Sequence, residues 1–434
     1  MDRKNDLKLA ISDWVNRKLP DVISREVDVP LNSEIIITMV GPRRSGKTYF
    51  MYSIIRKLGK NIPESNILYI NFEHERLRHM SSYDLTDLIS LYYELCNPDD
   101  SKPVYLFFDE IQVVQDWNIW INRLFESKKF HIYLSGSSSK LLSLEIATEL
   151  RGRSIDFLIL PYSFREFLKV QNIDIKHPEL MIYSENRGLI LSALLYYMKY
   201  GSYPETLQME GIRDKLLKMY MDTIIVKDVG ERYKIEPSIL TDIFYYIINN
   251  YSKYLSGTKI YNYLKTLNYK ISAEKPLQIL RDFNEAFSIF TLDVYSRSFK
   301  SRKQYPKKVY IVDTGFVHIF LNKMEYGRLM ENIVFMELYR RSDSFELFQV
   351  YYWREYGKSN GKEIDFIVVK NGVINEMINV TYARNEEDIA DREIESFKVA
   401  SEELGSTKKT LITWDYNNPG DINCIPLWKW LLNL

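Results

Sequence analysis

The chain of 434 residues has little cysteine, little histidine and no surplus of charge of either sign. Its two cysteines, Cys96 and Cys424, form neither a pair nor a metal-binding spacing, and its five histidines show no zinc pattern, which fits a reducing compartment. The 58 basic and 58 acidic residues balance, so any nucleic-acid surface has to be local. No apolar run approaches the roughly 18 residues of a membrane span, and the N-terminus is too charged for a signal peptide. The sequence therefore predicts a cytoplasmic protein with no membrane partner.

The length and the apolar pattern indicate several domains, beginning with an α/β core. A chain this long is expected to hold two or three domains. Between residues 31 and 160, apolar strands alternate with helical stretches, which predicts a parallel sheet covered by helices. These strands are expected at residues 35–40, 67–72, 104–108, 131–135 and 155–160. The expected domains are 1–160 with a helical lead-in over residues 1–30, a helical lid at 161–250, a third domain at 251–325 and a fourth at 326–434.

Residues 41–48 spell Gly-Pro-Arg-Arg-Ser-Gly-Lys-Thr, a complete phosphate-binding loop. Its glycines let the backbone bend around a phosphate, and its N–H groups and the positive end of the next helix face the anion. Lys47 adds a charge for the β- and γ-phosphates, and the Thr48 hydroxyl can bind Mg²⁺. An apolar strand before the loop and a helix from Tyr49 to Leu58 supply the setting that the motif needs. The residues expected to contact the nucleotide are Gly41, Pro42, Arg43, Arg44, Ser45, Gly46, Lys47, Thr48 and Tyr49.

A second motif supplies what hydrolysis needs beyond nucleotide binding. The apolar run of residues 104–108 is followed by Asp109 and Glu110, and the carboxyl ends of strands are where α/β sheets bind ligands. Asp109 is expected to hold Mg²⁺ through water, together with Thr48, and Glu110 to polarise the attacking water.

Two further segments are candidates for sensing and stabilising the γ-phosphate. The strand at 131–135 leads into a run of serines, and a polar residue there, such as Ser137, could reach that phosphate. Past it lie Arg151 and Arg153. An arginine placed against a transferring phosphoryl group accelerates the reaction by about 10³–10⁵. Arg153 is the preferred candidate for this role. The expected catalytic residues are therefore Lys47, Glu110 and Arg153.

Together these motifs resemble an AAA-type ATPase family of archaea and bacteria. GPRRSGKT, LFFDEIQ, LSGSSSKLL and LRGRSIDFLILPYSFREFL occur in that family's order and spacing. The resemblance extends over nearly the whole chain, including residues 200–204, where Ser202 replaces a glycine of the family's Gly-Gly-x-Pro turn. It implies ATP rather than GTP, Asp109 and Glu110 as the metal-binding and catalytic acids, Ser137 or Ser138 near the sensor position, and Arg153 as the arginine of the Gly-Arg pair. Whether the chain forms a homo-oligomer stays open at this point.

Residues 256–312 predict a winged helix with a basic hairpin. Two short helices, the second beginning at Ala273 after a Ser272 cap and turning Leu277 inward, precede two strands. Between the strands, residues 297–308 hold six basic side chains and no acidic one. Such a hairpin could lie along the phosphates of double-stranded DNA, or it could be a solvated wing or a protein contact. The DNA-binding candidates are Arg297, Lys300, Arg302 and Lys303.

The last hundred residues resemble the PD-(D/E)XK nuclease core, with a departure that argues against cleavage. Glu331 and Glu337 lie on a predicted helix, and Asp365 lies on the strand that matches the one carrying the core aspartate. A working site needs an acid and a lysine two residues apart on the next strand to share a metal and activate water. Asn379 and Thr381 stand in those positions. The sequence therefore predicts a nuclease-derived scaffold that has lost its activity.

Glu376 and Lys362 are the nearest substitutes for the missing acid and lysine. Glu376 would face the other side of its strand from Asn379. Nothing in the sequence brings Lys362 into the lysine's role.

Three functions compete. The leading one is a Mg²⁺-dependent ATPase that couples nucleotide state to its helical and winged-helix parts on DNA. The others are an ATP-regulated nuclease and a slow nucleotide switch that binds a protein partner.

Overall fold

The structure, a computed structural model, contains two compact units, Met1–Pro161 and Tyr162–Leu434. We call them the first unit and the second unit. The described residues are 3–136, 149–150, 152–173, 184–296, 298, 300, 302, 305–321, 324–343, 346–355, 358, 361–405 and 407–434. No helix within these ranges is both long enough and apolar enough to cross a membrane.

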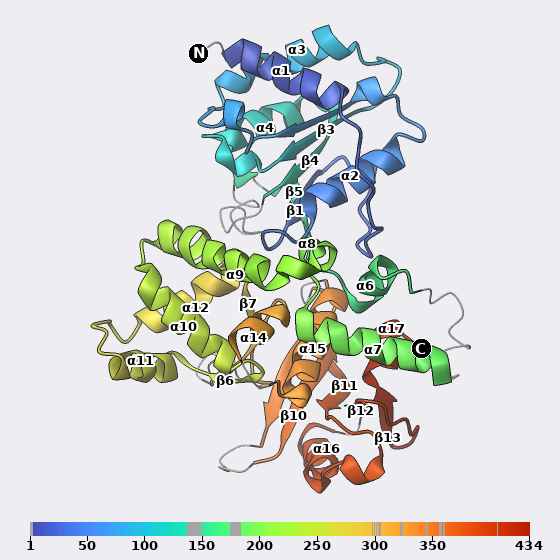
Figure 1. The fold of residues 1–434 in the computed structure, drawn as a ribbon, viewed down its shortest axis with the longest axis vertical. Helices are drawn as coiled ribbons and strands as arrows, with labels where there is room; N and C mark the ends of the chain where they lie inside the picture. The colour runs from blue at the N-terminus through green and yellow to red at the C-terminus, as the bar shows by residue number, and fades with distance from the viewer. Residues whose placement is uncertain are drawn as a thin grey trace. The chain divides into compact units, whose positions relative to one another are not determined.

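A five-stranded parallel sheet with the order β2–β3–β4–β1–β5 forms the centre of the first unit (Figure 1). Its strands are β1 (Ile36–Val40), β2 (Ile67–Asn71), β3 (Val104–Asp109), β4 (Phe130–Ser135) and β5 (Ser154–Leu158). Each lies within two residues of its expected range. The predicted α/β fold with a parallel sheet is therefore confirmed.

Helices cover both faces of this sheet. They are α1 (Arg3–Val15), α2 (Lys47–Leu58), α3 (Leu88–Cys96) and α4 (Trp117–Glu126). On one face, α2 packs on a row of strand side chains that includes Tyr69, Phe107 and Tyr133. On the other, Trp120 of α4 packs on Phe108, with ring centroids 5.0 Å apart. Neighbouring residues of one strand point to opposite faces, so Phe107 and Phe108 divide the core between these helices.

The helical lead-in is shorter than predicted, because α1 ends at Val15 and residues 16–35 form no helix or strand. Pro20 has no N–H to donate and biases the residue before it away from helical angles. The segment instead runs along the first unit's core, against which Leu19, Val22 and Val27 pack.

The first part of the second unit is mostly helical, as predicted. Its helices are α6 (Phe164–Val170), α7 (Ser184–Tyr200), α8 (Pro204–Gln208), α9 (Arg213–Thr223), a π-helix (Ile224–Glu231) and α10 (Pro237–Asn249). Two further helices, α11 (Gly257–Thr266) and α12 (Lys275–Glu285), precede a three-stranded antiparallel sheet. That sheet has the order β6–β8–β7 and consists of β6 (Lys253–Leu255), β7 (Ile289–Leu292) and β8 (Lys307–Ile311).

The prediction for the start of α12 was wrong. The helix begins at Lys275 rather than Ala273, and Ser272 does not cap it with its side chain. Pro276 lies in the first turn, where its missing N–H costs nothing, and this position favours a start at Lys275. Leu277 is 40% exposed instead of facing inward, while Ile279 lies in the core.

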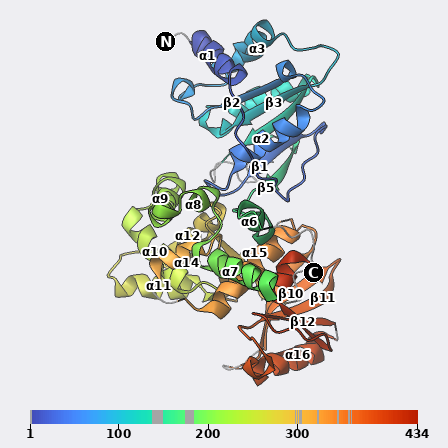
Figure 2. The same ribbon diagram turned by 45° about the vertical axis from the view of Figure 1, so that its right-hand side comes forward.

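The C-terminal part of the second unit holds a mixed five-stranded sheet with the order β13–β12–β11–β10–β9. The strands are β9 (Gln349–Arg354), β10 (Glu363–Lys370), β11 (Val373–Val380), β12 (Lys408–Thr413) and β13 (Ile422–Pro426). Helix α16 (Asp391–Leu404) lies beside this sheet (Figure 2). Its Phe397 packs in one core with residues of β9, β10, β11 and β12. From α15 (Tyr326–Arg341), Phe335 contacts Phe366 of β10. Helices α14 (Gly315–Phe320) and α17 (Leu427–Leu432) complete the unit.

The turn at residues 200–204 joins α7 to the end of β8 through one buried carboxylate. Gly201 has a φ of +74°, and a Cβ there would lie 1.7 Å from Asp313 Oδ1. The Ser202 N–H and hydroxyl donate to Asp313 Oδ2 over 2.7 and 3.1 Å, and the Gly315 N–H donates to Oδ1 over 2.8 Å. Burial raises the pKa of Asp313 to about 6 despite these donors. Ser202, which departs from the family's glycine, therefore supplies an extra donor to a buried acid.

Candidate functional site

The phosphate-binding loop follows β1 and ends where α2 begins at Lys47. Gly46 has a φ of +97° at the helix N-cap, and Arg44 is also left-handed at +64°. At Gly41, with a φ of +142°, a Cβ would stand 2.3 Å from the Ile159 carbonyl oxygen. Both glycines are thus required by geometry, since L-residues rarely adopt these angles.

Lys47 lies inside this loop and is 5% exposed. Its Nζ donates to the carbonyl oxygens of Gly41 and Pro42 over 3.0 and 2.8 Å. The Ser45 hydroxyl is buried at the same place and has no hydrogen-bond partner among the described residues. A buried ammonium within a loop of main-chain N–H groups, beside an unsatisfied hydroxyl, fits a phosphate.

The outer residues of the motif differ in their contacts. Arg43 pairs with Glu73 over 3.6 Å. Tyr49 is 53% exposed on α2. Behind the loop, Arg25 donates to the Ser45 carbonyl over 3.0 Å and to the Leu160 carbonyl over 2.5 Å.

Asp109 ends β3 as a fully buried carboxylate with several donors. Thr48 Oγ1 and the Tyr69 hydroxyl each donate to its Oδ2 over 2.7 Å, and Asn71 Nδ2 lies 3.4 Å from the same oxygen. The Ser135 hydroxyl donates to Oδ1. Burial raises the pKa of Asp109, and the neighbouring Glu110 raises it further. A threonine hydroxyl and a carboxylate in contact beside a phosphate loop form a donor set that fits Mg²⁺.

Glu110 turns away from the strand with a left-handed φ of 53° and is nearly buried. Gln112 Nε2 donates to Glu110 Oε2 over 2.5 Å, and the main-chain N–H of Glu110 donates to the Ser135 hydroxyl over 3.2 Å. A carboxylate held next to the metal-binding acid is suited to orient a water molecule.

Three residues of this site were missed in the sequence: Tyr69, Asn71 and Ser135. They join Asp109 because paired residues on adjacent parallel strands share a face, and Asn71 pairs with Asp109. Polar side chains at the ends of the predicted strands were the available signal. Ser137 and Ser138, the expected sensor candidates, lie outside the described residues.

Arg153 lies at the amino-terminal end of β1, whereas the phosphate loop of the same chain follows the carboxyl-terminal end of that strand. Its carbonyl accepts from the N–H of Ile36, the first residue of β1, whereas the loop follows the last. The five residues of β1 span roughly 16 Å. The guanidinium donates to Glu126 over 2.9 Å and to Asn122 over 3.2 Å. Arg153 therefore lies away from the phosphate loop of its own chain, and its role stays a prediction. Arg151 lies outside the described part of the chain.

In the second unit, a buried lysine lies among acids that include two of those assigned to a nuclease-like site from the sequence, Glu331 and Asp365. Lys308 of β8 is 2% exposed, and its Nζ lies 3.0 Å from Glu331, 2.5 Å from Glu363 and 2.8 Å from Asp365. Glu363 and Asp365 share a face of β10 because they are two residues apart. Tyr310, two residues along β8 from Lys308, donates to Glu331 over 2.8 Å. We call Lys308 with these three acids the Lys308 cluster.

The charges of this cluster are strongly coupled. Burial alone would lower the pKa of Lys308, but Asp365, Glu331 and Glu363 raise it well above its usual value. Burial raises the pKa of Glu331 to about 8, although Lys308 opposes this shift. The cluster is therefore held by an ammonium ion of the chain itself.

The other predicted nuclease residues divide between places. Asn379 accepts from the Asp365 N–H over 2.9 Å and donates to Glu393 over 3.1 Å, so it joins the edge of the cluster. Burial and the Asp365 charge raise the pKa of Glu393 to about 7. Thr381 lies just past the end of β11, with its N–H on the Ile412 carbonyl.

Glu337 does not belong to this cluster, which corrects the prediction. It is buried against Arg165, Arg340 and Arg341, with nitrogen–oxygen distances of 2.8, 3.3 and 2.8 Å. Burial opposes its ionisation, yet the three arginines keep the pKa of Glu337 below its usual value. It stabilises the chain's C-terminal helix, because Arg341 also donates to the Trp430 carbonyl.

The basic run 297–308 is only partly available to a partner. Lys308 is buried, and Lys307 pairs with Asp293 over 2.6 Å. Arg302 donates to the Tyr351 hydroxyl over 3.1 Å, while Lys300 is exposed. Arg297 and Lys303 lie outside the described residues.

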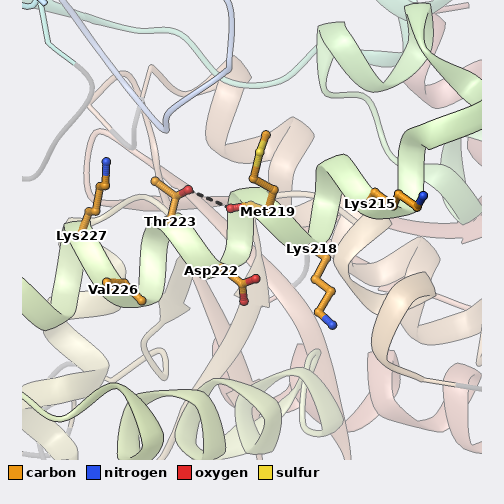
Figure 3. Close-up of a pocket in the computed structure, with 7 residues that line it drawn as sticks. All are labelled: Lys215, Lys218, Met219, Asp222, Thr223, Val226 and Lys227. Carbon is orange, nitrogen blue, oxygen red and sulfur yellow. Dashed lines mark hydrogen bonds between the residues drawn. The ribbon is translucent and has the colours of Figure 1, made fainter.

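A shallow depression of about 380 Å³ lies along α9 and the π-helix (Figure 3). Its side chains point in different directions from one continuous helical surface, so they do not converge as a reaction site would. The lining residues are Lys215, Lys218, Met219, Asp222, Thr223, Val226 and Lys227.

Comparison with known proteins agrees with the geometry of the first unit. Residues 33–168 match an AAA domain, 191–326 a domain of unknown function (DUF8612) and 326–430 another (DUF4143). The chain is 36% identical to the uncharacterized protein MJ1544 of Methanocaldococcus jannaschii, over 96% of this chain and 92% of the relative. The chain therefore belongs to the same family as MJ1544 and carries an AAA domain at residues 33–168.

A more distant relative of the chain is found in a second organism. An uncharacterized protein of Haemophilus influenzae is 30% identical over 78% of this chain and 80% of its own. Among solved structures, the Walker-type ATPase PABY2304 of Pyrococcus abyssi is similar with a TM-score of 0.39 at 14% identity, covering 74% of this chain and 95% of that one.

Replacing Lys308 with methionine is expected to destabilise the second unit strongly, because three carboxylates lose their shared cation. Breaking a buried ion pair costs up to about 3–5 kcal/mol. The adjacent Lys307→Met variant is the matched control, since its partly exposed pair contributes about 1 kcal/mol or less. The measurement is urea denaturation followed by amide-exchange protection of residues 363–370. Equal losses in the two variants would show that Lys308 carries no special load.

Proposed function

We propose that the protein is a Mg²⁺-dependent ATPase whose nucleotide state controls the second unit. The contact that carries this proposal is the 2.7 Å hydrogen bond between Thr48 and Asp109, next to the buried Lys47 ammonium. It joins the phosphate loop to the acid that ends β3, so one ligand touching both would link them. Bound ATP with Mg²⁺ would supply the phosphoanhydride bond and the charge that neutralises the phosphates.

The residues divide the work by their chemistry. The main-chain N–H groups of residues 43–46 and of the start of α2 would bind the phosphates of ATP, together with the Lys47 ammonium. Thr48 and Asp109 would hold the metal. Glu110, kept in place by Gln112, orients the attacking water.

Lys47→Ala and Glu110→Gln are expected to separate binding from hydrolysis. A ligand at a hundred times its dissociation constant stabilises the native state by about 2.7 kcal/mol. ATP with Mg²⁺ should therefore raise the melting temperature of the wild type and of Glu110→Gln, and raise it much less in Lys47→Ala. Phosphate release should be lost in both variants. An equal thermal shift in Lys47→Ala would contradict the nucleotide site, and normal turnover in Glu110→Gln would move the catalytic role elsewhere.

For Arg153 we propose a role on the nucleotide of a second copy of the chain. Its place at the amino-terminal end of β1, near the partly exposed Glu126, supports action across an interface rather than within one chain. Mixing Arg153→Ala with Lys47→Ala should then restore part of the ATPase activity, because each variant supplies the residue that the other lacks. The Lys47→Ala/Arg153→Ala double variant mixed with Lys47→Ala is the control and should stay inactive. No recovery in variants shown to exchange subunits would exclude this role.

DNA is the partner that we propose for the second unit, through the winged-helix segment at residues 251–325. The exposed Lys300 supports this, although Lys307 and Lys308 are engaged within the chain. Binding to duplex DNA should weaken with salt at a log–log slope of about −0.9 per phosphate contact. The Lys300→Gln/Arg302→Gln variant should flatten this slope on unrelated sequences, whereas Lys307→Gln should leave it unchanged. A salt-independent interaction would exclude phosphate contacts by this hairpin.

Cleavage of DNA is not part of the proposal. The Lys308 ammonium lies among the acids that a nuclease would use for metal, and Asn379 stands where a second metal-binding acid is needed. Turnover measured with and without duplex DNA separates the two remaining functions. DNA should change the turnover of the proposed ATPase, and it should not change that of a slow switch that acts on a protein partner. We also propose that the chain is divided into four domains, with boundaries after residues 160, 250 and 325.

A further inference from the structure

Tyr69 is the donor to Asp109 that the nucleotide-binding motifs do not include. It lies on β2, is 3% exposed, and donates to Asp109 Oδ2 over 2.7 Å. Thr48 donates to the same oxygen, but its hydroxyl is also the group expected to bind Mg²⁺. If Thr48 bound a metal instead, Tyr69 would remain as a donor to Oδ2, and Ser135 would remain on the other oxygen.

The Tyr69 hydroxyl is restricted to donating this hydrogen bond. Its oxygen lies 2.7 Å from Asp109 Oδ2, and because a carboxylate oxygen accepts hydrogen bonds, the phenol O–H is the donor of this contact.

The ring of Tyr69 is held by two aromatic neighbours from different helices. Its centroid is 5.4 Å from that of Trp14 on α1 and 5.1 Å from that of Tyr52 on α2. Trp14 is fixed in turn by its Nε1–H, which donates to the Ile67 carbonyl over 2.8 Å. Since a tyrosine ring has few rotamers, packing on two sides also sets the position of its hydroxyl.

We propose that Tyr69 is a positioning residue for Asp109, and that Trp14 holds Tyr69, so that helix α1 is part of the ATPase site. This rests on the proposed ATPase function and adds the N-terminal helix, which precedes the AAA domain match at residues 33–168. Groups that orient a metal-binding side chain typically contribute 10- to 100-fold, roughly, to metal affinity or activity.

The test compares Tyr69→Phe with Tyr133→Phe. Tyr133 is the matched control, because it is buried on the same face of the sheet but donates to the Leu31 carbonyl over 2.8 Å. ATP affinity is measured by equilibrium binding in excess EDTA and across a Mg²⁺ titration, with the melting temperature of each ligand-free variant alongside. In Tyr69→Phe, affinity in EDTA should stay within about twofold of the wild type, while the gain from Mg²⁺ and the turnover number fall by about 10-fold or more. Tyr133→Phe should retain both.

Trp14→Leu gives a second measurement that leaves β2 unchanged. It should reduce the Mg²⁺-dependent gain in affinity in the same direction as Tyr69→Phe. The Trp14→Leu/Tyr69→Phe double variant should lose little more than Tyr69→Phe alone, because residues that act through one contact are not additive. Losses that multiply would show that Trp14 acts by another route and would overturn its part of the proposal.

The two proposals fail in different ways. A wild type that binds ATP with Mg²⁺ but never releases phosphate contradicts the ATPase function, and the binding titrations still decide the role of Tyr69. A Tyr69→Phe variant with the Mg²⁺ dependence of Tyr133→Phe overturns the positioning role, whatever the turnover of the wild type.

Discussion

The structure of the first unit depends on keeping one buried carboxylate, Asp109, satisfied. Removing an ionised carboxylate from water costs several kcal/mol unless hydrogen bonds replace its hydration. Four neutral side chains from β2, β4 and α2 provide these bonds, which requires β2, β3 and β4 to end at the same level of the sheet. Because the donors are neutral, they place no positive charge beside Asp109 that would repel a metal. The order of the strands and the entry of α2 thus serve the same constraint.

The second unit meets the same cost in the opposite way. Around Asp365, the compensation comes from the full positive charge of Lys308, which also contacts Glu331 and Glu363. An ammonium ion within 3.0 Å of three carboxylates offsets part of the negative charge that would otherwise attract a divalent cation. The residue joins β8 to α15 and β10, so a group that resembles a nuclease centre acts as a link between parts of the unit. Two clusters of buried acids in one chain therefore have different chemistry, because one is surrounded by neutral donors and the other contains a cation.

Features encoded locally could be predicted from the sequence, and features that depend on register or on distant contacts could not. The five strands of the parallel sheet and helix α2 follow from short apolar runs and from the phosphate loop itself. Tyr69, which lies within β2 rather than at its end, enters the site only through the pairing of strands, which no local pattern reports. Lys308 lies in a basic run that suggests a DNA contact, and its partners Glu331 and Asp365 are 23 and 57 residues away. Leu280 and Phe283 of α12 are buried, as their helical spacing predicts, but Leu277 lies in the first turn of the helix and is 40% exposed, which the same spacing did not reveal.

The residues before the AAA domain match contact the nucleotide site at two separate points, and this constrains how the site moves. Arg25 holds the Ser45 carbonyl of the phosphate loop, and Trp14 packs on Tyr69, which holds Asp109. The loop and Asp109 are the two groups that a bound nucleotide with its metal would join. Since Trp14 and Arg25 belong to one continuous segment of the chain, displacing that segment would loosen both groups together. A ligand that draws the loop and Asp109 together would favour the docked segment by the same free energy, because coupling between two binding events is reciprocal. The N-terminal segment is thus the part of the first unit whose position should report the nucleotide state most directly.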